Sequence, residues 1–166
     1  MKIGMVGGIG PESTADYYQR LIRRYRETVD PDGYPQLVID SIDMTAMLDI
    51  VADGDWDGLV DMLLGSLKAL RKAGAKLAFI ASNTPHVVFD RVQSASPIPL
   101  VSIVEAARSE AQRLGIQKAA LLGTGFTMSS GYYAAAFDKA GITLATPASN
   151  EREYIEHKLF SEIERG

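Results

Sequence analysis

Three short loops carry most of the side chains that could do chemistry, and each follows a nearly continuous apolar run. They are residues 7–14 (the glycine loop), residues 81–86 (the serine loop) and residues 123–130 (the threonine loop). Glycines let a ligand approach the backbone, hydroxyl and amide groups donate hydrogen bonds, and a helix that begins in such a loop aims free N–H groups at an anion. Three loops of this kind at the carboxyl ends of strands predict a crevice that binds a small anion.

The glycine loop, GGIGPEST, has two further interpretations: a dinucleotide-binding turn, or a tight turn without a ligand. Its spacing fits a dinucleotide fingerprint poorly, because the third glycine would fall at Ser13 and Pro11 has no N–H to offer a phosphate. NAD binding is therefore the weakest of the three interpretations, and an anion site is the preferred one.

The serine loop, ASNTPH, follows an apolar run and leads into another helix, for which Pro85 suits the first turn. Its polar side chains could cap that helix, through Asn83 or Thr84, or contact a ligand. His86 is either an ordinary first-turn residue or a ligand contact. Open α/β sheets bind ligands outside the carboxyl ends of their strands, so we expect Ser82, Asn83 and Thr84 to line the same cavity as the glycine loop.

Strand-like and helix-like segments alternate along the chain. Short apolar runs predict strands of a parallel sheet at residues 2–7, 36–42, 76–81, 99–102, 118–123 and 142–146. Apolar residues recur on one helical stripe between residues 56 and 73, with Asp55 as the cap and Gly74 after the end. Ser102 and Glu105 form the pattern of a capping box, before a helix that stops at Gly115. The alternation predicts an α/β fold with Rossmann-like, doubly wound parallel sheets.

A weak internal repeat favours two pseudo-symmetric halves. The segment MVGG at residues 5–8 and the segment LLGT at residues 121–124 are each followed by two hydroxyl residues and a tyrosine at the same spacing. We expect a first half at residues 1–101, with the glycine and serine loops, and an incomplete second half at residues 102–166. A second half of matching size would need more residues than follow Ser102.

The composition argues against several classes of partner and site. The formal net charge is −4, the pI is near 5.2, and no basic stripe alternates with aromatics, which argues against nucleic acid. Four arginines between residues 20 and 26 are interpreted as a solvated helix face. No apolar run is long enough to span a membrane, and the start leads into a strand rather than a signal peptide, so a cytoplasmic location is expected. Without cysteines and with two histidines, no metal site is expected.

Five segments of the chain, in the expected order, resemble the aspartate/glutamate racemase family, specifically its aspartate-racemase branch. They are GMVGGIGPESTADYY at residues 4–18, GDWD at 54–57, AGA at 73–75, SNTPH at 82–86 and ALLGT at 120–124. The first and the fourth of these segments are the specific ones.

The resemblance implies two Rossmann-like halves with a small-molecule amino acid or other carboxylate bound between them, and no cofactor. In the family, a cysteine from each half flanks the substrate α-carbon, and one removes the α-proton while the other returns it on the opposite face. Because this proton is very weakly acidic, the site must also stabilise the substrate carboxylate. The resemblance assigns the catalytic position to Ser82, and substrate binding to Gly8, Ile9, Gly10, Asn83, Thr84, Thr124 and Thr127.

Three features depart from the family pattern. Ser82 stands where the first cysteine is expected, and a neutral hydroxyl is a poorer base than a thiol, although some relatives carry threonine there. The family's second cysteine would lie beyond residue 166. Met44 stands in the loop where aspartate enzymes have an arginine, and Arg165 is a loose match for a lysine that binds the side-chain carboxylate.

The leading hypothesis is a cofactor-independent amino-acid racemase of the aspartate/glutamate type in a truncated chain. The alternative is a catalytically degenerate, racemase-like protein that binds a small carboxylate, and a nucleotide-binding regulator is the third hypothesis. A helix is expected at residues 150–164, and its apolar residues need a partner surface: Tyr154, Ile155, Leu159, Phe160 and Ile163. We therefore expect a homodimer, or a chain from which the remainder is missing.

Overall fold

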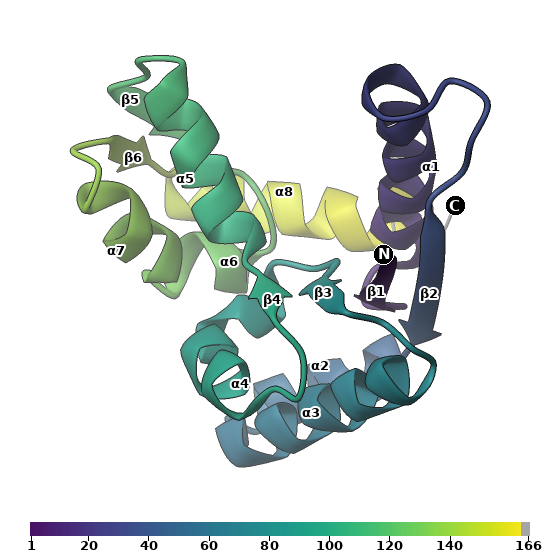
Figure 1. The fold of residues 1–166 in the computed structure, drawn as a ribbon. Helices are drawn as coiled ribbons and strands as arrows, with labels where there is room; N and C mark the ends of the chain where they lie inside the picture. Colours follow the sequence, from purple (N-terminus) through teal and green to yellow (C-terminus); the bar gives the residue numbers. More distant parts are fainter. Residues whose placement is uncertain (164–166) are drawn as a thin grey trace. The chain divides into compact units, whose positions relative to one another are not determined.

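The computed structural model describes residues 1–163, and the chain forms two compact units, Met1–Val101 (unit 1) and Ser102–Gly166 (unit 2) (Figure 1). Unit 1 contains the glycine and serine loops, and unit 2 contains the threonine loop. Arg165, the loose match for a family lysine, lies outside the described residues.

Unit 1 is built on a four-stranded parallel sheet in the order β2-β1-β3-β4. Its strands are β1 (Lys2–Gly7), β2 (Gln36–Ser41), β3 (Leu77–Ile80) and β4 (Leu100–Val101). The central strand β1 pairs with β2 from Lys2 opposite Gln36, and with β3 from Ile3 opposite Leu77. Because Met5 and Val6 have no exposed surface, β1 is buried on both faces, as its apolar run predicts.

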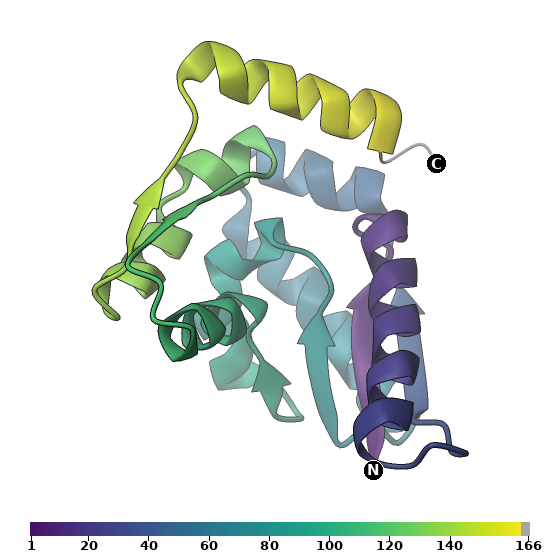
Figure 2. The same ribbon diagram turned by 90° about the horizontal axis from the view of Figure 1, so that it is seen from above.

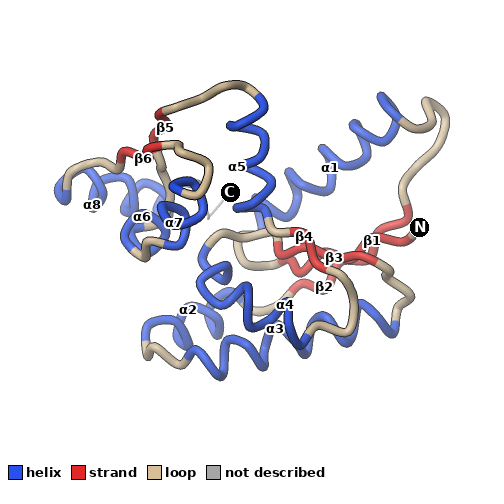
Figure 3. The backbone as a smooth tube through the Cα atoms, turned by 60° about the vertical axis from the view of Figure 1, so that its left-hand side comes forward, coloured by secondary structure: helices blue, strands red, loops and turns tan. Residues whose placement is uncertain are grey.

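The helices of unit 1 cover both faces of this sheet (Figure 3). On one face lie α2 (Met44–Ala52), α3 (Trp56–Lys72) and α4 (Phe89–Ala95), and on the other lies α1 (Pro11–Thr28). A 3₁₀ turn, Thr84–Val88, joins β3 to α4. The arrangement confirms the predicted α/β fold with a parallel sheet.

Helix α3 supplies most of the core of unit 1. It begins where the Asp55 carboxylate accepts a hydrogen bond from the Gly58 N–H at 2.9 Å, and it ends just before Gly74, whose φ of 92° closes the turn. Four leucines along one face of α3 have no exposed surface: Leu59, Leu63, Leu67 and Leu70. They pack against the apolar side chains of the sheet, so the predicted stripe is the face that holds helix and sheet together.

Unit 2 has a smaller parallel sheet of two strands, β5 (Lys118–Ala120) and β6 (Thr143–Ala145). Its helices are α5 (Ile103–Arg113), α6 (Gly125–Ser129), α7 (Tyr132–Asp138) and α8 (Ser149–Lys158). Helix α8 continues into a π-helical turn, Leu159–Ile163, and Figure 2 shows the two as one long rod. The helix predicted at residues 150–164 is therefore present, but its last described turn is not α-helical.

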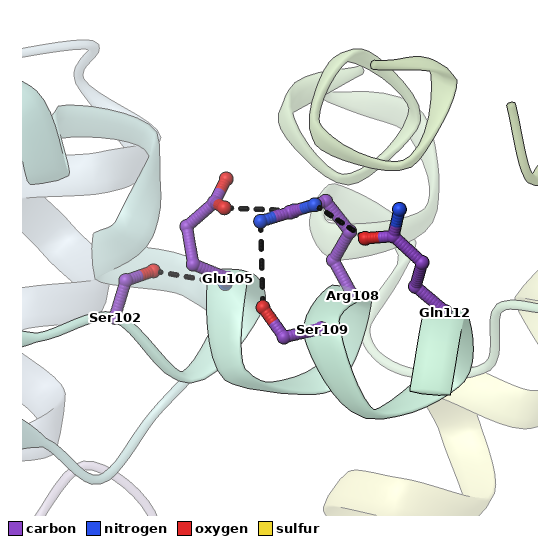
Figure 4. A network of polar contacts seen from close by, with 5 residues as sticks. All are labelled: Ser102, Glu105, Arg108, Ser109 and Gln112. Carbon is purple, nitrogen blue, oxygen red and sulfur yellow. Dashed lines mark hydrogen bonds and ion pairs between the residues drawn. The ribbon is translucent and has the colours of Figure 1, made fainter. Parts of the chain in front are cut away.

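Helix α5 begins at the predicted cap, and its first turns carry a polar network (Figure 4). Ser102 Oγ accepts the Glu105 N–H at 3.2 Å, which is the serine half of a capping box. The Glu105 carboxylate instead accepts from Arg108 Nε at 2.8 Å, and the same guanidinium donates to Gln112 and Ser109. The predicted glutamate half of the capping box is therefore wrong, because Arg108, one turn away, binds the Glu105 carboxylate.

Strand β1 has the predicted bounds, whereas the other strands are shorter than their apolar runs. Backbone pairing nevertheless continues for one residue past three of them. After β2, the Ile42 N–H donates to Gly7 O at 3.0 Å. The Ala81 N–H donates to Val6 O after β3, and the Leu121 N–H donates to Ala145 O after β5, both at 2.9 Å. The apolar runs include residues that leave the sheet at its carboxyl edge, where the loops begin.

An apolar surface lies along α8. A shallow groove runs between α8 and the strand ends, and its walls include Ala120, Ala145, Pro147, Tyr154 and Ile155. Four large apolar side chains are exposed among the described residues of unit 2: Leu114, Leu122, Tyr154 and Ile163. Soluble monomers rarely leave an apolar patch of this kind uncovered.

We expect the 166-residue chain to self-associate through this surface, so sedimentation should give a species heavier than the 18.0 kDa monomer. Tyr154→Ser should shift the equilibrium toward the monomer. Tyr34→Ser is the matched control, because Tyr34 is 66% exposed against 64% for Tyr154 but lies in unit 1. A monodisperse monomer with a cooperative thermal transition would contradict this expectation.

Candidate functional site

The glycine and serine loops meet where the strand order of unit 1 reverses. From β1 the chain passes to β2 on one side, and from β3 it passes to β4 on the other side. Strands β1 and β3 are parallel neighbours, so the loops that follow them leave the same edge of the sheet. This switch point is where open α/β sheets bind ligands, and it brings the predicted positions of unit 1 together.

Gly8 shapes the glycine loop but does not offer its N–H to a ligand. Its φ is 84°, and a Cβ atom at this position would lie 2.3 Å from Ile42 O, so only glycine fits. The Gly8 N–H donates to Thr14 Oγ1 at 2.9 Å. The expectation that the Gly8 N–H binds a substrate carboxylate is therefore corrected, because Thr14 already accepts this hydrogen bond.

The next two residues, Ile9 and Gly10, do offer backbone donors. Their N–H groups donate to no acceptor among residues 1–163. Gly10 is the N-cap of α1, whose N-terminus carries the positive end of the helix dipole. An anion next to Ile9 and Gly10 would meet both the backbone donors and this dipole, as in the anion-binding interpretation of the loop.

Ser82, Asn83 and Thr84 lie at the carboxyl end of β3. Ser82 is half-buried, Asn83 is exposed and Thr84 is buried. Asn83 occupies the N-cap position of the 3₁₀ turn, but its side chain makes no capping hydrogen bond there. The capping interpretation of Asn83 is therefore wrong, and its exposed side chain stands beside the predicted catalytic position.

His86 is an internal residue, which decides between its two interpretations. It is 5% exposed, its ring stacks on Phe89 with a centroid distance of 5.0 Å, and its Nδ1–H donates to Ser82 O at 2.8 Å. Burial lowers the pKa of His86 to about 4, against a smaller opposing effect of this hydrogen bond. His86 is thus a neutral support beneath Ser82, and the ligand-contact interpretation is not supported.

In unit 2, Thr124 and Thr127 have different environments. Thr124 is the N-cap of α6, and its Oγ1 accepts the Thr127 N–H at 3.1 Å. Thr127 is only 3% exposed, and its hydroxyl is contacted by the hydroxyls of Thr124 and Tyr132. The buried Thr127 hydroxyl therefore supports the shape of the loop, and its assignment to substrate binding stays a prediction.

Glu156 of α8 is a residue that the sequence did not indicate. Its Oε1 accepts the Gly125 N–H at 3.2 Å, so this carboxylate braces the threonine loop. A Cβ atom on residue 125 would lie 2.7 Å from Glu156 Oε2. The two residues are 31 positions apart, and no local pattern marks a contact at that separation.

Comparison with known proteins identifies the family. The family described as Asp/Glu/hydantoin racemase matches residues 6–165 of this chain. The chain belongs to this racemase family. A relative, the broad-specificity amino-acid racemase RacX of Bacillus subtilis (strain 168), is 30% identical over 135 residues. The match covers 79% of this racemase-family chain and 58% of RacX, so the chain spans less than two thirds of that relative's length.

Two solved structures match the fold of the racemase-family chain. An aspartate racemase homologue from Pyrococcus horikoshii OT3 is 38% identical with a TM-score of 0.84, and the match covers 98% of this chain and 71% of that one. A putative Asp/Glu racemase from Yersinia pestis is 30% identical with a TM-score of 0.86, at 97% and 70% coverage. These matches confirm the resemblance read from the sequence and the predicted α/β class.

The described part of this racemase-family chain has neither a metal-ligand cluster nor a membrane-spanning helix. Among residues 1–163, no group of three or more histidine, aspartate or glutamate side chains could hold a metal ion. Within the same residues, none of the helices is long and apolar enough to cross a membrane.

Gly8→Ala should destabilise unit 1 by more than about 3 kcal/mol, because it adds backbone strain to a collision with Ile42 O. Gly54→Ala is the matched control, with a similar φ of 68° but no atom within 4 Å of the new Cβ, and should cost about 1–2 kcal/mol. Urea unfolding of both variants measures the difference. Equal losses would show that the tight approach to Ile42 is unimportant.

His86 should make the free energy of unfolding fall as the pH drops from 6.5 to about 4. The unfolded chain takes up a proton on this histidine near pH 6.5, whereas the folded state keeps the ring neutral to about pH 4. The unfolded state therefore gains up to about 3 kcal/mol across this window.

Urea unfolding across this pH window should show a flatter dependence for His86→Asn than for the wild type. His157→Asn, which replaces an exposed histidine, should keep the wild-type slope. If His86→Asn and the wild type lose stability in parallel, the buried imidazole is not the origin of the pH dependence.

Proposed function

We propose that this chain is a cofactor-independent amino-acid racemase that removes and returns the substrate α-proton, with the switch point of unit 1 as its carboxylate-binding site. Its membership in the racemase family supports the reaction class. The single observation that carries the proposal is the position of Ser82, which lies at the carboxyl end of β3, beside the glycine loop after β1.

Recognition of the α-carboxylate is the first task of such a site. The Ile9 and Gly10 N–H groups and the N-terminus of α1 supply positive potential, and exposed Asn83 supplies an amide. As the α-proton leaves, negative charge moves onto the carboxylate, so donors aimed at its oxygens stabilise the transition state more than the ground state.

Proton transfer is the second task, and the proposal assigns one face of the α-carbon to Ser82. In one direction its hydroxyl returns a proton to the carbanion and becomes an alkoxide, and in the other direction this alkoxide accepts the α-proton. The group that accepts the proton must be matched by a second group on the opposite face that returns a proton, so that the configuration inverts. The family resemblance places that second group beyond residue 166. The α-carboxylate is common to all amino acids, so the recognition described here fits a broad range of substrates; the relative RacX is itself named a broad-specificity racemase.

A second candidate function is carboxylate binding without catalysis. The observation that favours it is that Ser82 stands where the family resemblance places the first cysteine. The Ser82 hydroxyl is a poor base at neutral pH, and His86 Nδ1 is engaged with Ser82 O rather than with this hydroxyl. On this alternative, the chain retains the binding loops of a racemase but has lost the soft base.

The two functions differ in α-proton exchange, which NMR follows as deuterium uptake from solvent by L- and D-glutamate. We expect slow uptake with the wild type and an increase of about tenfold or more with Ser82→Cys, because a thiol is partly ionised near neutral pH and is a better base. Ser82→Ala should abolish the uptake. Carboxylate binding with no uptake by any of the three proteins would favour the binding function.

A further inference from the structure

We propose that Ser13 and His86 are positioning residues that together fix the backbone of Ser82 and thereby the direction of its side chain. This inference rests on the proposed function only for its catalytic consequence. The structural part concerns two hydrogen bonds, one to the peptide group before Ser82 and one to the peptide group after it.

Ser13 holds the peptide group before Ser82. Its hydroxyl lies in the first turn of α1, 2.9 Å from Ala81 O and 3.0 Å from Gly10 O. The hydroxyl proton is shared between these two carbonyls, so Ser13 ties the glycine loop to the serine loop. Residue 13 is also where a dinucleotide fingerprint would have its third glycine. A glycine at this position would lack the hydroxyl that links the two loops.

His86 holds the peptide group after Ser82. Its Nδ1–H donates to Ser82 O at 2.8 Å, and stacking on Phe89 fixes the plane of the ring. A carbonyl oxygen can only accept, so the proton must reside on Nδ1 in this geometry. The depressed pKa of His86 keeps the ring neutral at physiological pH, which leaves that single tautomer in place.

The two peptide groups that flank Ser82 determine its backbone conformation. Each peptide group is planar, so the only soft dihedrals at Ser82 are its own φ and ψ. Fixing the planes of the Ala81 and Ser82 carbonyls therefore fixes both dihedrals, and with them the direction of the Cα–Cβ bond. A proton-transferring group must be held within about 0.5 Å of its productive position, so these two side chains set the precision of the site.

The structural part is tested by NMR on the full chain, without any ligand. Residual dipolar couplings and the HN–Hα coupling of Ser82 should change in Ser13→Ala and in His86→Leu, which remove the donors. Ser13→Thr keeps the hydroxyl and His86→Asn keeps an N–H donor near the position of Nδ1, so both should retain the wild-type couplings. Thr28→Ala is the control, because it removes a hydroxyl whose one hydrogen bond among residues 1–163 goes to Arg24 O, at the far end of α1.

Wild-type Ser82 couplings in both donor-deleted variants would overturn the inference. A long-range ¹H–¹⁵N spectrum of the wild type offers a check that needs no variant, since the Nε2–H tautomer of His86 at neutral pH would also overturn it. Thermal unfolding of each variant establishes that the chain is folded when the couplings are measured.

The catalytic consequence is tested in the Ser82→Cys background, where residue 82 is the only thiol in the chain. Adding Ser13→Ala should lower the maximal rate of deuterium uptake by glutamate about tenfold while leaving KM nearly unchanged, because the base is displaced and the carboxylate donors are not. Ser13→Thr should restore the rate. Equal losses in kcat and affinity would overturn the positioning role. No uptake in Ser82→Cys itself would instead contradict the proposed function. The NMR couplings of Ser82 would then still test the structural part.

Discussion

The pairing of β1 with β3 is the constraint on which the candidate site of unit 1 depends. It places the ends of two strands side by side, and the loops that follow them carry the glycines and the Ser82 position. Both faces of β1 are buried, and slippage by one residue would replace Val6 against the leucines of α3 by a neighbour of different size, so core packing locks the register. The same packing that stabilises the core therefore decides which functional residues become neighbours.

Cysteine and serine at residue 82 differ in what they need in order to act as a base. A thiol becomes a base through its own ionisation, whereas a hydroxyl needs a neighbouring group to accept its proton. His86 is the closest titratable side chain in the serine loop, but its Nδ1 proton is committed to the main chain of Ser82. His86 is thus suited to holding Ser82 in place, and its Nδ1 is not available to activate the hydroxyl. This is why Ser82→Cys tests function so directly, since it changes reactivity without changing the supports.

Local sequence patterns predicted the features that depend on neighbours a few residues away. The bounds of β1, the buried face of α3 and the Ser102 cap all follow from such spacing. The contacts that shape the site join distant residues, as Ser13 does to Ala81 O across 68 positions. Burial of His86 and Thr127 also depends on tertiary packing, so their polar side chains were read from sequence as ligand candidates. The loops could be located from the sequence, but their internal hydrogen bonds could not.

In both units, a side chain from another element braces a candidate loop before any ligand is bound. Ser13 of α1 reaches the serine loop, and Glu156 of α8 reaches the threonine loop. Ordering a loop costs conformational entropy, and a loop that is already ordered does not incur this cost when its ligand binds. Donors held in advance also stabilise developing charge without reorganising during the reaction. Bracing of this kind would therefore serve both proposed functions, carboxylate binding and α-proton transfer.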